Sequence, residues 1–258
     1  MNRINQKLKE NKKLLSIYFT AGYPNLNDTV TIIQDLEKSG VDMIEIGLPF
    51  SDPLADGPTI QSSSTQALKN GMTTEALFSQ LKDIRKSVNI PLIIMGYFNP
   101  IHKIGAQKFV KKIKSLGVDG LIIVDLPPEE DDELCVHCLS NELNFIRLLT
   151  PTSDDNRLPR LLKNTSGFLY YVSIAGVTGT KVPVKESVGK EINRIKEKTD
   201  TPICVGFGIK TPEDAKNIAQ LADGVVVGSA IIEKINSNFS EKAVFEFIKS
   251  LSKAVHLV

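Results

Sequence analysis

The sequence predicts an α/β protein, a single (β/α)8 TIM barrel that spans residues 1–258 and has an N-terminal capping helix. Three observations predict this fold. First, short apolar runs alternate with longer amphipathic segments along the whole chain. The length of 258 residues is typical of one such barrel. Finally, no linker, low-complexity tract or charge block marks a domain boundary. A doubly wound open sheet is the alternative.

Eight β-branched or apolar runs are the expected strands. They are 14–20, 43–47, 92–95, 120–124, 145–149, 168–173, 203–206 and 224–227. A weak internal repeat supports a barrel of similar units, because Gly40-Val41-Asp42 leading to Leu48-Pro49 is echoed by Gly117-Val118-Asp119 leading to Leu126-Pro127.

Helices are expected between these strands, where apolar residues recur at helical spacing, as Leu77, Leu81 and Ile84 do. The candidates are 27–38, 74–87, 106–115, 129–141 and 212–221. Asn27 and Thr211-Pro212 supply the expected N-cap and first-turn signals.

Composition and charge exclude several classes of protein. The chain is 41% hydrophobic and 24% charged, as globular proteins are. A formal charge of +1 gives no global attraction to nucleic acid or to an anionic membrane. No apolar run is long enough for a membrane span or a signal peptide, and three cysteines do not suggest a disulfide framework, so a cytoplasmic location is expected.

Glu45 is the first candidate for catalysis, because it lies inside a strongly apolar strand. Strand residues alternate between the barrel interior and the helices, and this alternation points Glu45 inward. Burial raises the pKa of a carboxyl group toward neutrality, as a general acid or base requires. The alternative is a Glu45 neutralised by a basic partner, but Arg147 is the only basic residue in the eight runs.

Asp56 is the second candidate, in a loop from Leu48 to Thr59 that contains three prolines and leads into a helix. The loop follows the second strand, so it presents Asp56 over the same barrel mouth as Glu45. The alternative is a turn or N-cap aspartate. Together the two carboxylates offer one group that takes and returns a proton and another that holds a developing positive N–H.

Glycine loops after three consecutive strands predict a phosphate site. These are the segments 176–180, 206–209 and 228–230, the first of which could also close as a lid. Loops after the seventh and eighth strands commonly bind phosphate in barrels, because glycines allow close backbone approach and free N–H groups face the anion. Turn chemistry alone explains any one loop, whereas three at adjacent strand ends favour phosphate binding.

Metal and imine chemistry are disfavoured by the residues present. His102, His137 and His256 are scattered, and none lies at a strand end. No lysine ends a strand, and Lys210 lies in a loop beyond the glycines. The segment 135–138 resembles a metal or redox motif, but it lacks a second ligand pair and fits surface or helix-packing cysteines. The reaction class that remains is proton transfer on a phosphorylated small molecule with a flat ring.

The long segment 44–61 reads Ile-Glu-Ile-Gly-Leu-Pro-Phe-Ser-Asp-Pro-Leu-Ala-Asp-Gly-Pro-Thr-Ile-Gln. It looks like the signature of the tryptophan synthase alpha chain family, and the sequence resembles that family over nearly the whole chain. Further matches are 19–24, 125–130, 176–179, 206–209 and 228–230. The resemblance implies retro-aldol cleavage of indole-3-glycerol phosphate to indole and glyceraldehyde 3-phosphate.

The resemblance also implies roles for individual residues. It makes Glu45 the acid/base at the indole C3 and the glycerol hydroxyl, and Asp56 the acceptor of the indole N–H. Tyr18, Tyr97, Ile122 and Val124 then line the indole site, Tyr170 lies by Glu45, and the phosphate is held by Gly179, Phe207, Gly208, Gly228 and Ser229 with Thr178 beside them. Two departures are Ile174, where some relatives have an arginine, and Tyr18, which replaces a phenylalanine.

The same resemblance implies a partner that carries the cofactor. Indole passes to a beta chain that holds pyridoxal phosphate, in an expected alpha2-beta2 heterotetramer, while this chain needs no cofactor and no metal. The residues expected to face that partner are Pro49, Asp52, Asn99, Pro127 and Pro128. Two alternatives stay open: a stand-alone lyase that releases free indole, and a catalytically silent allosteric subunit.

Overall fold

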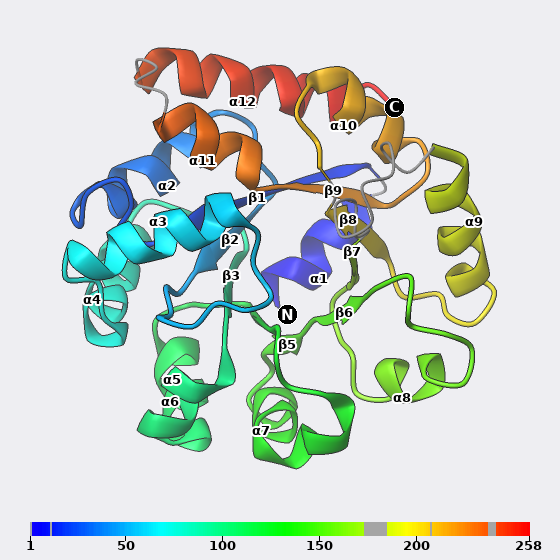
Figure 1. The fold of residues 1–258 in the computed structure, drawn as a ribbon, viewed down its shortest axis with the longest axis horizontal. Helices are drawn as coiled ribbons and strands as arrows, with labels where there is room; N and C mark the ends of the chain where they lie inside the picture. Colours follow the sequence, from blue (N-terminus) through cyan, green and yellow to red (C-terminus); the bar gives the residue numbers. More distant parts are fainter. Residues whose placement is uncertain (1, 11, 173–184, 207, 237–240) are drawn as a thin grey trace.

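The strands of the chain close into a parallel barrel (Figure 1). The computed structural model describes residues 2–10, 12–172, 185–206, 208–236 and 241–258. Its strands are β1 (Leu14–Thr20), β2 (Met43–Gly47), β3 (Leu92–Gly96), β4 (Gly120–Ile123), β5 (Asn144–Phe145), β6 (Arg147–Leu149), β7 (Leu169–Val172), β8 (Ile203–Gly206) and β9 (Gly224–Val227). They pair in the order β5-β4-β3-β2-β1-β9-β8-β7-β6.

The two ends of this order, β5 and β6, are halves of the expected strand 145–149. Only Ile146 separates them, and its N–H donates to the carbonyl of Leu121 in β4 at 2.9 Å. The first half therefore pairs with β4 and the second half with β7, which closes the sheet. The prediction of one continuous strand is wrong at Ile146, whereas the predicted barrel is confirmed.

Helices cover the outside of the barrel all round (Figure 1). They are α2 (Asp28–Lys38), α3 (Pro58–Lys69), α4 (Thr74–Ile84), α5 (Phe98–Ile104), α6 (Ala106–Ser115), α7 (Cys135–Ser140), α8 (Leu158–Leu162), α9 (Lys185–Lys196), α10 (Pro212–Ala219), α11 (Ser229–Asn236) and α12 (Glu241–His256), with a 3-10 helix η2 (Pro128–Glu133). Thr211 caps α10 as predicted, and its side chain accepts from the Asp214 N–H at 3.1 Å.

Two helix expectations need correction. The segment 129–141 is not one helix, because η2 ends and α7 begins on either side of Leu134, which has φ −148° and ψ −46°. Asp131 within η2 forms an ion pair with Arg147 in β6, and this long-range contact holds the acidic segment η2 against the barrel. The second concerns Asn27, which is the N-cap residue of α2 as predicted, but its side chain makes no capping hydrogen bond.

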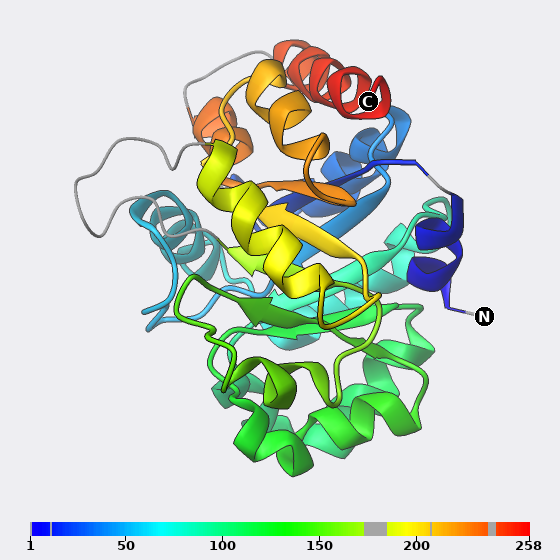
Figure 2. The ribbon, with the colours of Figure 1, turned by 90° about the vertical axis from the view of Figure 1, so that its right-hand side faces the viewer.

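The N-terminal segment caps the barrel at the end where the strands begin (Figure 2). It consists of α1 (Arg3–Lys7) and the 3-10 helix η1 (Leu8–Glu10). Ile4 is fully buried and belongs to the apolar cluster inside the barrel. Asn2 donates to the carbonyl of Asp119 at 2.6 Å, just before β4, and fixes the helix there. The predicted capping helix is confirmed.

Alternation along the strands divides the core into two parts. In β2, Ile44 and Ile46 belong to the cluster between strands and helices, whereas Met43 belongs to the cluster inside the barrel. Glu45 shares the inward face with Met43, as the pattern predicts. No helix in the described part of the chain is long and apolar enough to cross a membrane.

Candidate active site

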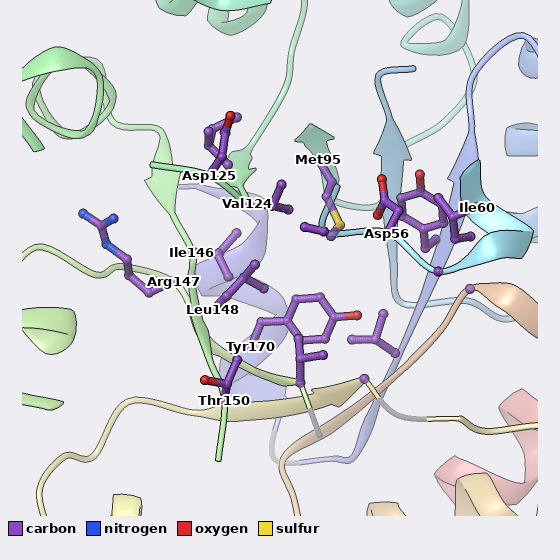
Figure 3. Close-up of a pocket in the computed structure, with 18 of the residues that line it drawn as sticks. Asp56, Ile60, Met95, Val124, Asp125, Ile146, Arg147, Leu148, Thr150 and Tyr170 are labelled. Carbon is purple, nitrogen blue, oxygen red and sulfur yellow. The ribbon is translucent and has the colours of Figure 1, made fainter. Parts of the chain in front are cut away.

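A cavity of about 1150 Å³ opens at the carboxyl ends of the strands (Figure 3). Its lining comes from segments far apart in the sequence. Among the lining residues are Tyr18, Asp56, Ile60, Met95, Val124, Asp125, Leu148, Thr150, Arg157, Tyr170, Gly206, Gly208, Lys210, Gly228 and Ser229. Parallel strands that all end on one side of the barrel bring these segments together.

Glu45 is fully buried at this end of β2. Ser16 in β1 donates a hydrogen bond from its Oγ to Glu45 Oε1 at 2.8 Å, and Oε2 has no partner among the described residues. Burial raises the pKa of the Glu45 carboxyl from 4.5 to about 7, with the Ser16 hydrogen bond opposing part of that rise. Glu45 is therefore poised to exchange a proton near neutral pH.

Arg147, the basic residue that the sequence left as a possible partner of Glu45, is used elsewhere. Its guanidinium pairs with Asp131 and donates to the carbonyl of Leu126 at 3.1 Å. In Figure 3 its guanidinium points away from Tyr170, although Arg147 is among the residues that line the cavity. Within the described residues no basic side chain lowers the pKa of Glu45, so the ion-paired alternative finds no support.

Tyr18 in β1 and Tyr170 in β7 are close enough to Glu45 to feel its charge, and both form part of the cavity wall. Both line the cavity and are almost fully buried, whereas Glu45 is not among the lining residues. The rings approach the barrel backbone closely: a Cβ on Gly47 would overlap the Tyr18 hydroxyl, and one on Gly206 would overlap the Tyr170 hydroxyl. Glycine at both strand ends is therefore what admits the two rings.

Asp56 is held over the mouth by a tyrosine. The Tyr97 hydroxyl donates to Asp56 Oδ2 at 3.0 Å and accepts from the N–H of Ala55 at 3.0 Å. The Tyr97 ring also packs on Phe50, with 5.2 Å between the ring centroids. Burial raises the pKa of Asp56, and the Tyr97 hydrogen bond opposes that rise. These contacts fix Asp56 in the loop between β2 and α3, at one side of the cavity.

Two of the predicted glycine loops meet at the cavity. Gly208 follows β8, and Gly228 and Ser229 follow β9 at the start of α11. The first helical hydrogen bonds of α11 are donated by Ile231 and Ile232 to the carbonyl of Gly228, so the preceding N–H groups lie outside the helical ladder. Helix N-termini of this kind attract anions.

The structure brings some predicted residues to the cavity and leaves others away from it. Val124 lines the cavity, whereas Ile122 is fully buried in the inner apolar cluster and is not among the lining residues. Asp52, Asn99 and Pro127 are exposed, Pro128 is half-buried and Pro49 is buried. Thr178, Gly179 and Phe207, together with Ile174 and the first of the three glycine loops, lie outside the described residues.

Sequence reasoning missed two features of the site. Ser16 reads as an ordinary small residue in an apolar strand, and only the barrel places its hydroxyl against Glu45. Lys210 brings a positive charge to the cavity rim beside Gly208. Its position directly after the glycine loop was a usable signal, since phosphate sites combine backbone N–H groups with a cation.

The cysteines of the segment 135–138 are buried and pack within α7. Burial raises the pKa of the Cys135 thiol to about 12. Among the residues that the structure covers, no group of three or more His, Cys, Asp or Glu side chains is arranged to hold a metal ion.

Comparison with known proteins gives a consistent result. A family model described as tryptophan synthase alpha chain matches residues 4–255. The tryptophan synthase alpha chain of Flavobacterium psychrophilum is 55% identical over 240 residues, covering 92% of this chain and 95% of that protein. The alpha chain of Flavobacterium johnsoniae is 53% identical over 252 residues, covering 96% and 98%.

Solved structures agree with these sequence matches. Tryptophan synthase subunit alpha from Legionella pneumophila has a TM-score of 0.92 and 36% identity, with 100% of both chains covered. A chain of tryptophan synthase from Mycobacterium tuberculosis, in an aminoacrylate-bound form, has a TM-score of 0.89 and 28% identity, covering 99% of this chain and 100% of that one.

Proposed function

This chain belongs to the tryptophan synthase alpha chain family, and we propose that Glu45 and Asp56 carry out the reaction of that alpha subunit. The reaction is the retro-aldol cleavage of indole-3-glycerol phosphate to indole and glyceraldehyde 3-phosphate, in tryptophan biosynthesis. The enzyme is a lyase.

Glu45 acts first as an acid and then as a base. It protonates C3 of the indole, which leaves the ring nitrogen positively charged and turns the ring into an electron sink. Glu45, now a carboxylate, then takes the proton from the hydroxyl on the adjacent glycerol carbon. The C–C bond breaks, and the electron pair of that bond restores the aromatic ring. The hydroxyl oxygen becomes the aldehyde oxygen of glyceraldehyde 3-phosphate. Because the protonated ring accepts the electron pair, the cleavage needs neither a metal nor a lysine imine.

Asp56 accepts a hydrogen bond from the indole N–H while positive charge develops there. A carboxylate held in place before the reaction stabilises that charge without reorganisation. The contacts of Tyr97 to Asp56 and to the Ala55 N–H keep the carboxylate in place. Tyr18 and Val124 line the cavity and, in this proposal, contact the flat ring with Tyr97 and Ile122.

The observation that carries the proposal is the environment of Glu45. It is a fully buried carboxyl with a pKa of about 7 and one oxygen that has no partner among the described residues, at the end of the barrel where Asp56, Gly208 and Gly228 line the cavity. A carboxyl group in such a site is suited to both giving and taking a proton at neutral pH.

The proposal requires that a bound ligand reach Glu45. Tyr18 and Tyr170 line the cavity and Glu45 does not, so we expect the ring to enter between these tyrosines or the carboxylate to rotate past them. Either movement brings Oε2 to the ligand, because Oε1 is the oxygen bonded to Ser16.

We assign the phosphate to the loops of Gly208 and of Gly228-Ser229, completed by Thr178, Gly179 and Phe207. The N–H groups ahead of the α11 ladder support this assignment. Lys210 on the same rim adds charge for a dianion, which neutral N–H donors alone do not supply.

The wider assembly is also a proposal. We expect residues 1–258 to form one catalytic domain in the cytoplasm, paired with a beta chain that carries pyridoxal phosphate in an alpha2-beta2 heterotetramer. The cofactor there belongs to the partner. The residues placed toward the partner are Pro49, Asp52, Asn99, Pro127 and Pro128, of which Asp52, Asn99 and Pro127 are exposed.

An assay of indole release tests the proposal. Glu45→Gln should abolish cleavage while the fold survives, because it removes the titrating group and keeps its volume. Glu75→Gln makes the same change on the exposed face of α4 and should keep full activity. Normal turnover by Glu45→Gln would refute the assignment.

The two alternatives differ from the proposal in the same assay. Strong stimulation by a beta chain is expected of a synthase subunit. High activity without any partner would indicate a stand-alone lyase, and no indole under either condition would indicate a silent subunit.

A further inference from the structure

Ser16 is the only described residue that donates a hydrogen bond to the Glu45 carboxyl. Its Oγ lies 2.8 Å from Glu45 Oε1, and both residues are fully buried. In the β1–β2 ladder Glu45 lies opposite Tyr18, whereas Ser16 lies opposite Met43, one inward layer nearer the capping helix. The hydroxyl therefore approaches the carboxyl from below, on the side away from the cavity.

The other titratable groups that face Glu45 stay neutral at pH 7. They are Tyr18 on β1, Tyr170 on β7 and Cys204 on β8. Burial raises the pKa of each of these groups above its ordinary value, and the Glu45 charge adds to that rise. In the described part of the barrel, the Ser16 hydroxyl is thus the one polar contact that distinguishes one Glu45 oxygen from the other.

We propose that Ser16 is a positioning residue for Glu45. Its hydroxyl occupies Oε1 of the Glu45 carboxyl and leaves Oε2 as the oxygen that exchanges the proton. Its hydroxyl can donate to Oε1 in both protonation states, but the bond is stronger to the carboxylate. Ser16 therefore fixes the orientation of the group and favours its charged form. The catalytic consequence rests on the proposed function of Glu45, whereas the hydrogen bond itself does not.

Titration of Glu45 in the full-length chain tests this role directly. Carbon-13 NMR of labelled glutamate δ-carbons follows each carboxyl, and Glu45→Gln identifies the Glu45 signal by its loss. Ser16→Ala removes the donor, Ser16→Cys keeps the volume with a weaker donor, and Ser16→Thr keeps a hydroxyl. Ser63→Ala is the matched control, because Ser63 is an equally buried serine that bonds to Thr20 at 2.7 Å.

We expect the pKa of Glu45 to rise by roughly one pH unit in Ser16→Ala, since a hydrogen bond to the charged form is lost. The rise should be smaller in Ser16→Cys and absent in Ser16→Thr and Ser63→Ala. The limb of the kcat/KM profile that reports Glu45 should move by the same amount, with KM unchanged because Ser16 does not line the cavity.

Two results would overturn the inference: an unchanged Glu45 pKa in both Ser16→Ala and Ser16→Cys, or an equal shift in Ser63→Ala. A Glu45 titration that moves while the activity profile stays fixed would support the role of Ser16. That same result would count against Glu45 as the catalytic acid, so the two proposals fail separately.

Discussion

Replacing Glu45 by glutamine should stabilise the fold at the pH where it destroys activity. Burial raises the pKa of Glu45 from 4.5 to about 7. A carboxyl whose pKa is higher in the folded state contributes stability below its unfolded value, and this contribution is lost as the pH rises through the folded value. The pKa shift corresponds to about 3 kcal/mol in the free energy of unfolding, and this stabilisation is lost between about pH 4.5 and pH 7.

Glutamine does not titrate, so Glu45→Gln should escape this loss. Between pH 4.5 and pH 8 the free energy of unfolding of the wild type should fall by about 3 kcal/mol relative to that of the variant. For a chain of this size this corresponds to roughly 6 to 12 °C in Tm. Thermal unfolding of both proteins across this range measures the difference, in which other titrating groups cancel. Glu75→Gln is the control and should show no such trend. A difference between Glu45→Gln and wild type that stays constant with pH would refute the reasoning.

Three further predictions follow from the same geometry. Asp56→Asn should lower kcat about 100-fold or more while keeping phosphate binding, because it removes the charge beside the indole N–H; wild-type rates would put that role in doubt. Gly208→Asp and Ser229→Asp should each weaken binding of a phosphorylated product at least tenfold by like-charge repulsion, measured by calorimetry. Ser115→Asp in α6, none of whose residues lines the cavity, should not. Ile4→Ala should cost about 2 to 5 kcal/mol in the free energy of unfolding, since Ile4 fills the barrel end; a loss below about 1 kcal/mol, as expected for exposed Lys9→Ala, would contradict the capping role.

Local patterns in the sequence predict the barrel and much of the site. The bounds of β1, β2, β8, β9 and α6 agree with the structure, because each is a short apolar run or a regular amphipathic segment. The inward direction of Glu45 follows from strict alternation in β2. Asp56 and the glycine loops follow from their positions just after strands, where barrels build their sites.

Contacts between distant residues explain what the sequence does not predict. The ion pair between Asp131 and Arg147 joins residues on two different elements, and it accompanies the break of the expected helix 129–141. The change of pairing partner at Ile146 likewise depends on β4 and β7, not on local composition. The bond from Ser16 to Glu45 spans two strands, so neither residue alone predicts it.

The depth of Glu45 is another such result. Alternation predicts an inward side chain, but it does not show that Tyr18 and Tyr170 line the cavity whereas the fully buried Glu45 does not. Those rings reach their places because glycine stands at positions 47 and 206. Packing across the barrel therefore decides how far the acid lies from a ligand.

A crystal structure with an unreactive analogue of indole-3-glycerol phosphate tests the central claim most directly. Our account predicts that Oε2 of Glu45 lies within about 3 to 3.5 Å of the indole C3, with Asp56 at the ring N–H and the phosphate on the loops of Gly208 and Gly228. An analogue seated in the cavity with Glu45 still enclosed behind Tyr18 and Tyr170, out of contact with the ring, would contradict it.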